Sequence, residues 1–166
     1  VAKGTFPSSW IPKTDEERIQ NLVWMFSDPE CAETEYEVTE KADGSSLTVA
    51  YSPAMRPENP LFVCSRNQEL EYDPGTKWCI ALARDNVLDK LIQFYNETGF
   101  EYAFQGELVG PGINGNRDAY QEQHWKVFKV WDIKNQKYLT PEARQNICER
   151  IDLEHVNVLK CGWKAF

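Results

Sequence analysis

The sequence predicts an α+β domain with mostly antiparallel sheets and flanking helices. Three observations favour this class. The chain has 166 residues, a length typical of one domain, so we assign residues 1–166 to a single domain. Segments with strand-like alternation outnumber segments with helical periodicity. Short connections between successive strand segments are more common than strand–helix–strand crossovers, which favours antiparallel pairing.

Composition excludes several classes of protein. Hydrophobic residues make up 42% of the chain and aromatic residues 13%, which is far from the composition of a disordered protein. The net charge of −8 argues against a broad electrostatic footprint for nucleic acid. No apolar run has the length of a membrane span, so we expect no membrane association. The five cysteines form no Cys-x-x-Cys pair, which predicts neither zinc nor disulfides. We expect a monomer in the reducing cytoplasm.

The first quarter of the chain is predicted to contain an extended lead-in, a helix and a strand. Residues 6–12 are punctuated by two prolines and are expected to be extended. Thr14 and Glu17 have the spacing of a capping box, which predicts a helix from Thr14 to about Phe26, ended by Pro29. Residues 35–40 then alternate as a strand.

The remaining elements follow from the same signals. Helical periodicity ending at Gly99 predicts a helix over residues 85–98, and Thr140 followed by Pro141 predicts the start of another. Loops rich in glycine and proline are expected at residues 52–59 and 110–116. Alternating or β-branched runs predict strands at residues 47–51, 61–65, 101–108, 125–133 and 156–159.

The stretch with the clearest chemical potential is Lys41-Ala42-Asp43-Gly44, which separates two predicted strands. Asp-Gly favours a tight turn, so we predict a hairpin with Lys41 at its end. Such a hairpin would place the lysine amine at the floor of a pocket. A solvated hairpin lysine fits the same pattern, because three fixed residues often match by chance.

Three further residues lie in or at the ends of predicted strands. Glu107 ends a strand just before a glycine-rich loop, and glycine lets backbone approach a ligand closely. Arg66 also follows a strand and carries a planar cation suited to phosphate, while Trp131 could stack on a base. Purely structural roles for these three residues are equally compatible with the sequence. These are a solvated glutamate, a surface ion pair and a core tryptophan.

Taken in order, these motifs resemble those of the covalent nucleotidyltransferases, and more narrowly the ATP-dependent RNA ligases of RNA repair. The resemblance covers nearly the whole chain. It implies a nucleotidyltransferase (ligase/ATP-grasp-like) fold and an adenylyltransferase domain. The matching segments are Phe6-Pro7-Ser8, the run from Ile11 to Asn21, Lys41-x-Asp43-Gly44, Arg66, the run from Gly106 to Asn116, and Val130-Trp131-Asp132-Ile133.

The resemblance implies an ATP-dependent reaction with Mg²⁺ or Mn²⁺ on RNA ends or a nicked duplex. Lys41 would attack the α-phosphate of ATP to form lysyl-AMP. Free lysine has a pKa of about 10.4, so cations near it would be needed to yield the neutral amine. The remaining implied residues are nucleotide-binding, with Glu107 also assisting metal placement: Glu40, Asp43, Gly44, Ser46, Arg66, Glu107 and Trp131. Ser46 stands where some relatives carry asparagine.

The sequence departs from the family pattern after Trp131. A later Glu-Gly-x-Val-type strand and a Lys-x-Lys-type strand, which the family uses for metal and phosphates, are not found in the remaining 35 residues. We therefore expect a domain that is incomplete at its C-terminus, with weak ATP binding and no RNA sealing by this chain alone. A DNA ligase, a GTP-dependent capping-type enzyme and a non-catalytic nucleotide- or RNA-binding module are the alternatives.

Overall fold

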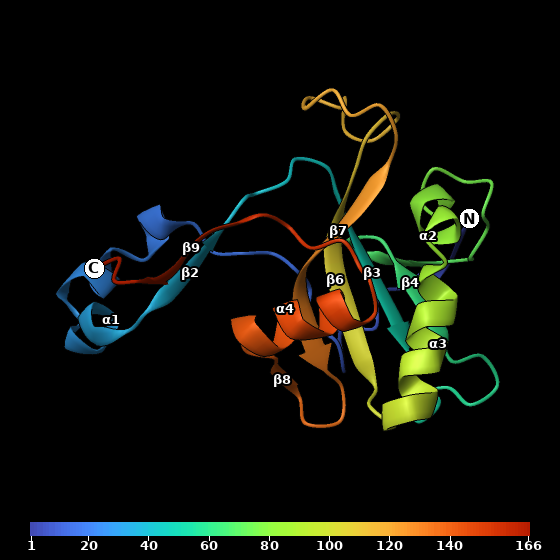
Figure 1. Cartoon of the computed structure of the whole chain (residues 1–166), viewed down its shortest axis with the longest axis horizontal. Coiled ribbons are helices and arrows are strands. Elements are labelled where there is room, and N and C mark those ends of the chain that lie inside the picture. The colour runs from blue at the N-terminus through green and yellow to red at the C-terminus, as the bar shows by residue number, and fades with distance from the viewer.

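The computed structural model describes residues 1–166 and contains one large sheet, one small sheet and four α-helices. The large sheet has seven strands in the order β1-β5-β4-β3-β6-β7-β8, and all neighbouring strands are antiparallel. The small sheet pairs β2 with β9 and lies to one side of the main body, together with α1 and the C-terminus (Figure 1). The predicted α+β class with mostly antiparallel sheet is confirmed.

Central strands β3, β6 and β7 are the long ones, and the edge strands are short. The strands are β1 Ala2–Thr5, β2 Tyr36–Thr39, β3 Ser45–Tyr51, β4 Leu61–Cys64, β5 Gln68–Leu70, β6 Tyr102–Val109, β7 His124–Asp132, β8 Lys137–Tyr138 and β9 Val158–Trp163. The α-helices are α1 Pro29–Glu33, α2 Ile80–Arg84, α3 Val87–Thr98 and α4 Pro141–Arg150.

Apolar side chains cover the two faces of the large sheet unequally. On one face, α2, α3 and α4 pack on the larger cluster, which includes Leu47, Phe104 and Trp125. The indole of Trp125 donates a buried 2.9 Å hydrogen bond to the Leu47 carbonyl, which satisfies its only polar group. The opposite face has a smaller apolar cluster, where Ile11 packs beside Ala50. The rest of this second face is therefore left for polar side chains.

Most of the longer predicted elements are confirmed. The predicted strands of 35–40, 47–51, 61–65, 101–108 and 125–133 correspond to β2, β3, β4, β6 and β7. Both predicted later helices are present, and Gly99 ends α3 with a φ of 73°. The last strand lies later than predicted, at Val158–Trp163. The sequence analysis missed β1, β5, β8, α1 and α2, which are too short to show a clear periodicity.

The predicted helix from Thr14 to Phe26 is wrong. Residues 12–18 are irregular, and two short 3₁₀ helices follow, η1 Ile19–Asn21 and η2 Val23–Ser27. Most of the apolar side chains that suggested a helix face are exposed, and Phe26 is 63% exposed. A helix gains most of its stability from packing an apolar face, and here that face has little to pack against. Asp28 instead caps α1.

The predicted hairpin around Lys41 is also wrong. Strands β2 and β3 do not pair with each other, because β2 pairs with β9 while β3 lies between β4 and β6. The Lys41 segment therefore crosses from the small sheet to the large one (Figure 1). Pairing between strands distant in sequence outweighed the local preference of Asp-Gly for a turn. The structure contains no helix with the length and hydrophobicity of a transmembrane span.

Candidate active site

Lys41 lies on the crossing between the two sheets, and its side chain is exposed. The segment around it is held against the large sheet by a close backbone approach at Gly44. A Cβ atom at this position would lie only 1.9 Å from the carbonyl oxygen of Leu108 in β6. The motif therefore needs glycine because two backbones meet there, since Gly44 has no positive φ and forms no hairpin turn.

Glu107 lies beside this segment, in the middle one of three paired strands whose side chains form a row of polar residues. The pairing register places Ser46 opposite Glu107, and Glu107 opposite Lys126, across β3, β6 and β7. Directly paired residues project on the same face of a sheet. Ser46 shares its face with Ala50 by alternation, so the row lies on the face opposite the helices. The structure thus brings Lys41, Gly44, Ser46 and Glu107 together.

The Glu107 carboxyl lies in a partly desolvated position beside other charges. Burial raises its pKa above the usual glutamate range. The neighbouring Gly44 amide lowers this pKa, the Asp43 carboxylate raises it, and the Lys41 ammonium lowers it. These four groups are therefore close enough to interact electrically.

A long loop between β6 and β7 holds the acidic residue of the motif. The loop extends beyond the end of the large sheet (Figure 1). Its Asn114 amide donates a 3.1 Å hydrogen bond to the Asp43 carboxylate, and its Arg117 guanidinium lies 3.4 Å from the same carboxylate. The glycine-rich loop that the sequence singled out therefore does contact the Lys41 segment, through Asp43.

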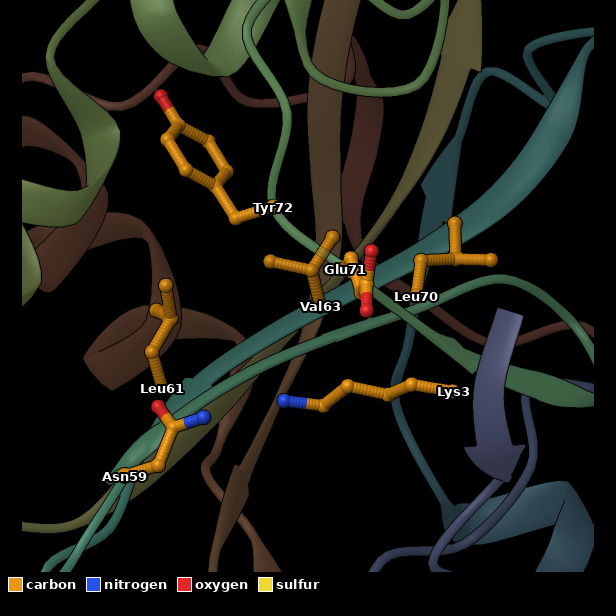
Figure 2. A pocket seen from close by; sticks show the side chains of 7 residues that line it. All are labelled: Lys3, Asn59, Leu61, Val63, Leu70, Glu71 and Tyr72. Atoms are coloured by element: carbon orange, nitrogen blue, oxygen red, sulfur yellow. The ribbon is translucent and has the colours of Figure 1, made fainter. Parts of the chain in front are cut away.

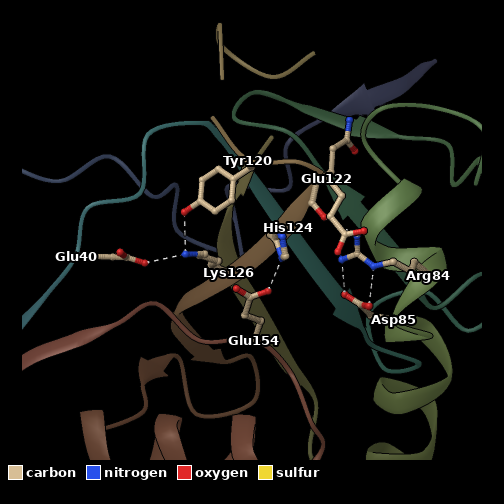
Figure 3. Close-up of polar contacts among 9 residues, drawn as sticks. Glu40, Arg84, Asp85, Tyr120, Glu122, His124, Lys126 and Glu154 are labelled. Atoms are coloured by element: carbon tan, nitrogen blue, oxygen red, sulfur yellow. Dashed lines mark hydrogen bonds and ion pairs between the residues drawn. The ribbon is translucent and has the colours of Figure 1, made fainter. Parts of the chain in front are cut away.

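Glu40, on the other side of Lys41, is held by a buried lysine. The Lys126 ammonium donates to Glu40 at 3.0 Å and to the Tyr120 hydroxyl at 2.9 Å, as Figure 3 shows. Asn157 donates its side-chain amide to the other Glu40 oxygen at 3.0 Å. Burial alone would raise the pKa of Glu40, but the hydrogen bonds from Lys126 and Asn157 outweigh burial and lower it.

The N-terminal segment contacts several polar side chains of this same face. The hydroxyls of Thr14 and Ser46 are 2.8 Å apart. Arg66 forms an exposed ion pair with Asp15 at 2.8 Å. The segment also contributes the Pro12 carbonyl, which accepts from Gln105 in β6 at 2.7 Å, and Glu16, which pairs with Lys129 of β7. Ser46 and Arg66 are therefore both engaged by residues 14–15.

Trp131 lies on the same face as Glu107, toward the other end of β7. The pairing register places it opposite Ala103. Its indole nitrogen donates to the Trp10 carbonyl at 2.9 Å, and its ring meets Tyr138 edge-on at 4.8 Å. Trp131 is only half-buried. Trp131 packs against the smaller apolar cluster and is also partly exposed to solvent.

Sequence reasoning missed Lys126, Tyr120, Asn114 and Arg117. Lys126 lies in a strand whose two alternating sets of side chains are both partly apolar. The sequence pattern therefore did not predict that Lys126 is buried and forms an ion pair. Tyr120 and Arg117 follow the recognised Gly106–Asn116 run. Tyr120 reaches Glu40 through Lys126, and Arg117 lies beside Asp43. Both contacts depend on the pairing of β6 with β3, which places Ser45 opposite Leu108.

A shallow pocket of about 250 Å³ lies elsewhere, at the β1, β4 and β5 edge of the large sheet (Figure 2). Its lining includes Lys3, Val63 and Tyr72, and none of the residues that the sequence predicted for the site. Open polar faces enclose little volume, so pocket size is a weaker guide here than the arrangement of charges. No group of three or more His, Cys, Asp or Glu residues is arranged to hold a metal ion.

Comparison with known proteins places this geometry in a family. The family model described as RNA ligase matches residues 34–165. The chain is 34% identical to Naegleria gruberi RNA ligase solved with PPi, with a TM-score of 0.84 over 97% of this chain and 46% of that chain.

Two variants of the same Naegleria enzyme are also similar. One, with ATP and Mn, has a TM-score of 0.84 at 34% identity over 96% of this chain and 45% of that chain. Another, with AMP and Mn, has a TM-score of 0.83 at 34% identity over 96% and 46%. The chain therefore spans less than half the length of these structures. No curated protein matches the chain.

Proposed function

Because the family model covers most of its length, the chain belongs to the RNA ligase family, and we propose that the protein is an ATP-dependent RNA ligase with Lys41 as nucleophile. One observation carries the proposal. Lys41 is exposed on the crossing between the two sheets, where the Glu107 carboxyl interacts with the Gly44 amide, with the Asp43 carboxylate and with the charge of Lys41. This arrangement suits covalent catalysis by an amine.

The reaction proceeds in three displacements at phosphorus. The neutral Lys41 amine attacks the α-phosphorus of ATP, the bond to the β-phosphate bridging oxygen breaks, and pyrophosphate leaves as lysyl-AMP forms. The RNA 5′-phosphate then takes the AMP and releases the lysine. Finally, a 3′-hydroxyl attacks the activated 5′-phosphate, forms the phosphodiester and expels AMP. Positioning and charge stabilisation do most of the catalytic work in such steps.

The remaining site residues divide between nucleotide and metal. We propose that the Glu40 and Gly44 backbones place the nucleotide. Ser46 and Arg66 would contact ribose or phosphate after exchanging their present partners, and Trp131 would stack on adenine. Base–aromatic stacking contributes about 1–3 kcal/mol per base in single-stranded nucleic acid complexes, so Trp131 would add substantially to affinity. The partial exposure of Trp131 supports this role.

We propose that Glu107, with Asp43 beside it, would help to hold a divalent cation that is shared with the substrate. Glu107 and Asp43 interact electrically, and burial raises the pKa of Glu107 while the Asp43 charge raises it further. Mg²⁺ is commonly held by one or two carboxylates together with substrate phosphates, which supports this proposal. Bound Mg²⁺ or Mn²⁺ supplies charge neutralisation for the triphosphate and lowers the pKa of the nearby lysine.

RNA ends or a nicked duplex are the proposed substrates, and the proposed form is a cytoplasmic monomer. The five unpaired cysteine thiols support a reducing compartment. We propose residues 1–166 as the nucleotide-binding part of the adenylyltransferase domain, which on its own binds ATP weakly and does not seal RNA.

The test is covalent labelling of the full-length gene product by radioactive ATP in the presence of Mg²⁺. The wild type is expected to form an adduct from ATP and not from GTP, and its phosphoramidate (P–N) bond should be stable to alkali and cleaved by acid. Lys41→Ala and Lys41→Arg are both expected to abolish it, because a guanidinium stays protonated. Lys134→Ala, which changes an exposed lysine in the turn after β7, is the control and should label normally. Labelling of Lys41→Ala would overturn the assignment.

A further inference from the structure

Glu40 is the residue whose position most directly sets that of Lys41. The Lys41 side chain is exposed, so its direction depends on the backbone that carries it. Strand β2 ends at Thr39, and the last backbone contact before the crossing is the Glu40 amide, which donates to the Asn157 carbonyl at 2.9 Å. The Glu40 side chain then adds contacts that fix this point to other elements.

Lys126 is the contact that joins Glu40 to the large sheet. Its ammonium donates to Glu40 at 3.0 Å, and only 9% of the Lys126 side chain is exposed, against 28% for Glu40. A second hydrogen bond of 2.9 Å to the Tyr120 hydroxyl fixes the ammonium from the side of the β6–β7 loop (Figure 3). A long, buried side chain with two partners is held in one place, which makes it a rigid anchor.

Lys126 lies between Glu107 of the large sheet and Glu40, the residue before Lys41. It lies in β7 directly opposite Glu107, the carboxylate that faces Lys41 from the sheet side. Its charge is maintained, because hydrogen bonds to Tyr120 and Glu40 raise the pKa of Lys126 although burial alone would lower it. One side chain therefore connects β7, the strand paired with the one that bears Glu107, to the residue that precedes Lys41.

We infer that Lys126 is a positioning residue for adenylation: its ammonium holds the Glu40 carboxylate and so keeps the Lys41 amine in line with the α-phosphate of ATP. This inference rests on the proposed function. It assigns Lys126 an effect on the rate of attack and none on ATP affinity, since its ammonium is directed at Glu40 and Tyr120. A misplacement of about 1 Å can cost about 100-fold in rate, so loss of the anchor should be measurable.

The experiment measures single-turnover formation of lysyl-AMP by the full-length gene product at increasing ATP concentrations. Each variant yields a maximal rate and a half-saturating ATP concentration. Lys126→Met should lower the maximal rate by about 10- to 100-fold and leave half-saturation within about 3-fold of the wild type. Lys126→Arg keeps a cation and should be faster than Lys126→Met. Lys134→Met makes the same change at an exposed position and should behave as the wild type.

A double-variant cycle separates positioning through Glu40 from other effects. If Lys126 acts through Glu40, Glu40→Gln with Lys126→Met should be no slower than the slower single variant, because coupled residues are not additive. Asn157→Ala removes the other side-chain donor to Glu40 from an exposed residue. It should lower the maximal rate without shifting half-saturation, and it decides the question if Lys126→Met does not fold.

Three results would overturn the inference while the wild type still labels. The first is a maximal rate of Lys126→Met equal to that of the wild type. The second is a change in the half-saturating ATP concentration alone, which would mean that Lys126 contacts ATP directly. The third is an equal maximal rate for Lys126→Met and Lys126→Arg. Additive losses in the cycle would also overturn it. Absence of labelling in the wild type would instead contradict the proposed function, so the two failures are distinguishable.

Discussion

Replacement of Gly44 by alanine tests whether backbone approach, and not turn formation, explains the glycine of the motif. The added Cβ would lie 1.9 Å from the Leu108 carbonyl oxygen, 2.8 Å from the Leu108 carbonyl carbon and 2.9 Å from a Val109 methyl group. Ordinary contact begins near 3.4 Å, so the Gly44 backbone and β6 would have to separate by at least about 1.5 Å. Two of the three neighbours are backbone atoms, which cannot move aside as a flexible side chain does.

The cost follows from this separation. Overpacking typically costs about 1–3 kcal/mol, and each weakened hydrogen bond adds about 0.5–1.5 kcal/mol. Pairing of Ser45 with Leu108 and of Ser46 with Glu107 begins directly after Gly44, so at least one such bond is affected. We expect Gly44→Ala to lose about 3 kcal/mol of unfolding free energy. For a domain of this size, that corresponds to a Tm lower by about 6–12 °C.

Thermal unfolding followed by circular dichroism measures this change, and ATP labelling measures its effect on Lys41. Gly4→Ala is the matched control, because the nearest neighbour of its Cβ would be a Glu69 carboxylate oxygen at 3.9 Å, which is an ordinary van der Waals contact. It should leave Tm within about 2 °C of the wild type, in the range of ordinary surface substitutions. A Tm for Gly44→Ala as close to the wild type as that of Gly4→Ala would refute the close-approach explanation.

Two further predictions concern ionisable groups. Glu107→Gln should reduce lysyl-AMP formation at least about 100-fold through the lost carboxylate. The same variant should unfold less readily at neutral pH. Because the pKa of Glu107 is raised in the folded state, its ionisation lowers the free energy of unfolding as pH rises from the unfolded-state pKa through the folded-state pKa. A lower free energy of unfolding for Glu107→Gln than for the wild type would contradict this. His155 has a pKa lowered mainly by burial and accepts a hydrogen bond from Arg144 at 2.8 Å. Stability should therefore fall as pH drops below about 6.5, the ordinary histidine value, and this loss should shrink in His155→Gln when urea unfolding is measured from pH 7 to pH 5.

The sequence by itself determined the fold class, most of the long elements and the lysine that we propose as the nucleophile. The β-branched composition of β3, the alternation of β6 and the periodicity of α3 are local properties that can be recognised in the sequence. The Lys41-x-Asp43-Gly44 motif and the Gly106–Asn116 run likewise depend on neighbouring residues in the chain. Their matching order was enough to predict the family to which the chain belongs.

Only the tertiary structure decided how Lys41 is held. Strand β2 pairs with β9 from the far end of the chain, so the expected hairpin is replaced by a crossing between sheets. The expected helix from Thr14 was likewise lost, because Thr14 bonds to Ser46 and its neighbours lack a core to pack against. Lys126 reaches Glu40 across 86 positions of sequence, a contact that no local pattern encodes. Such contacts follow from strand order and register, which are set by long-range pairing and core packing together.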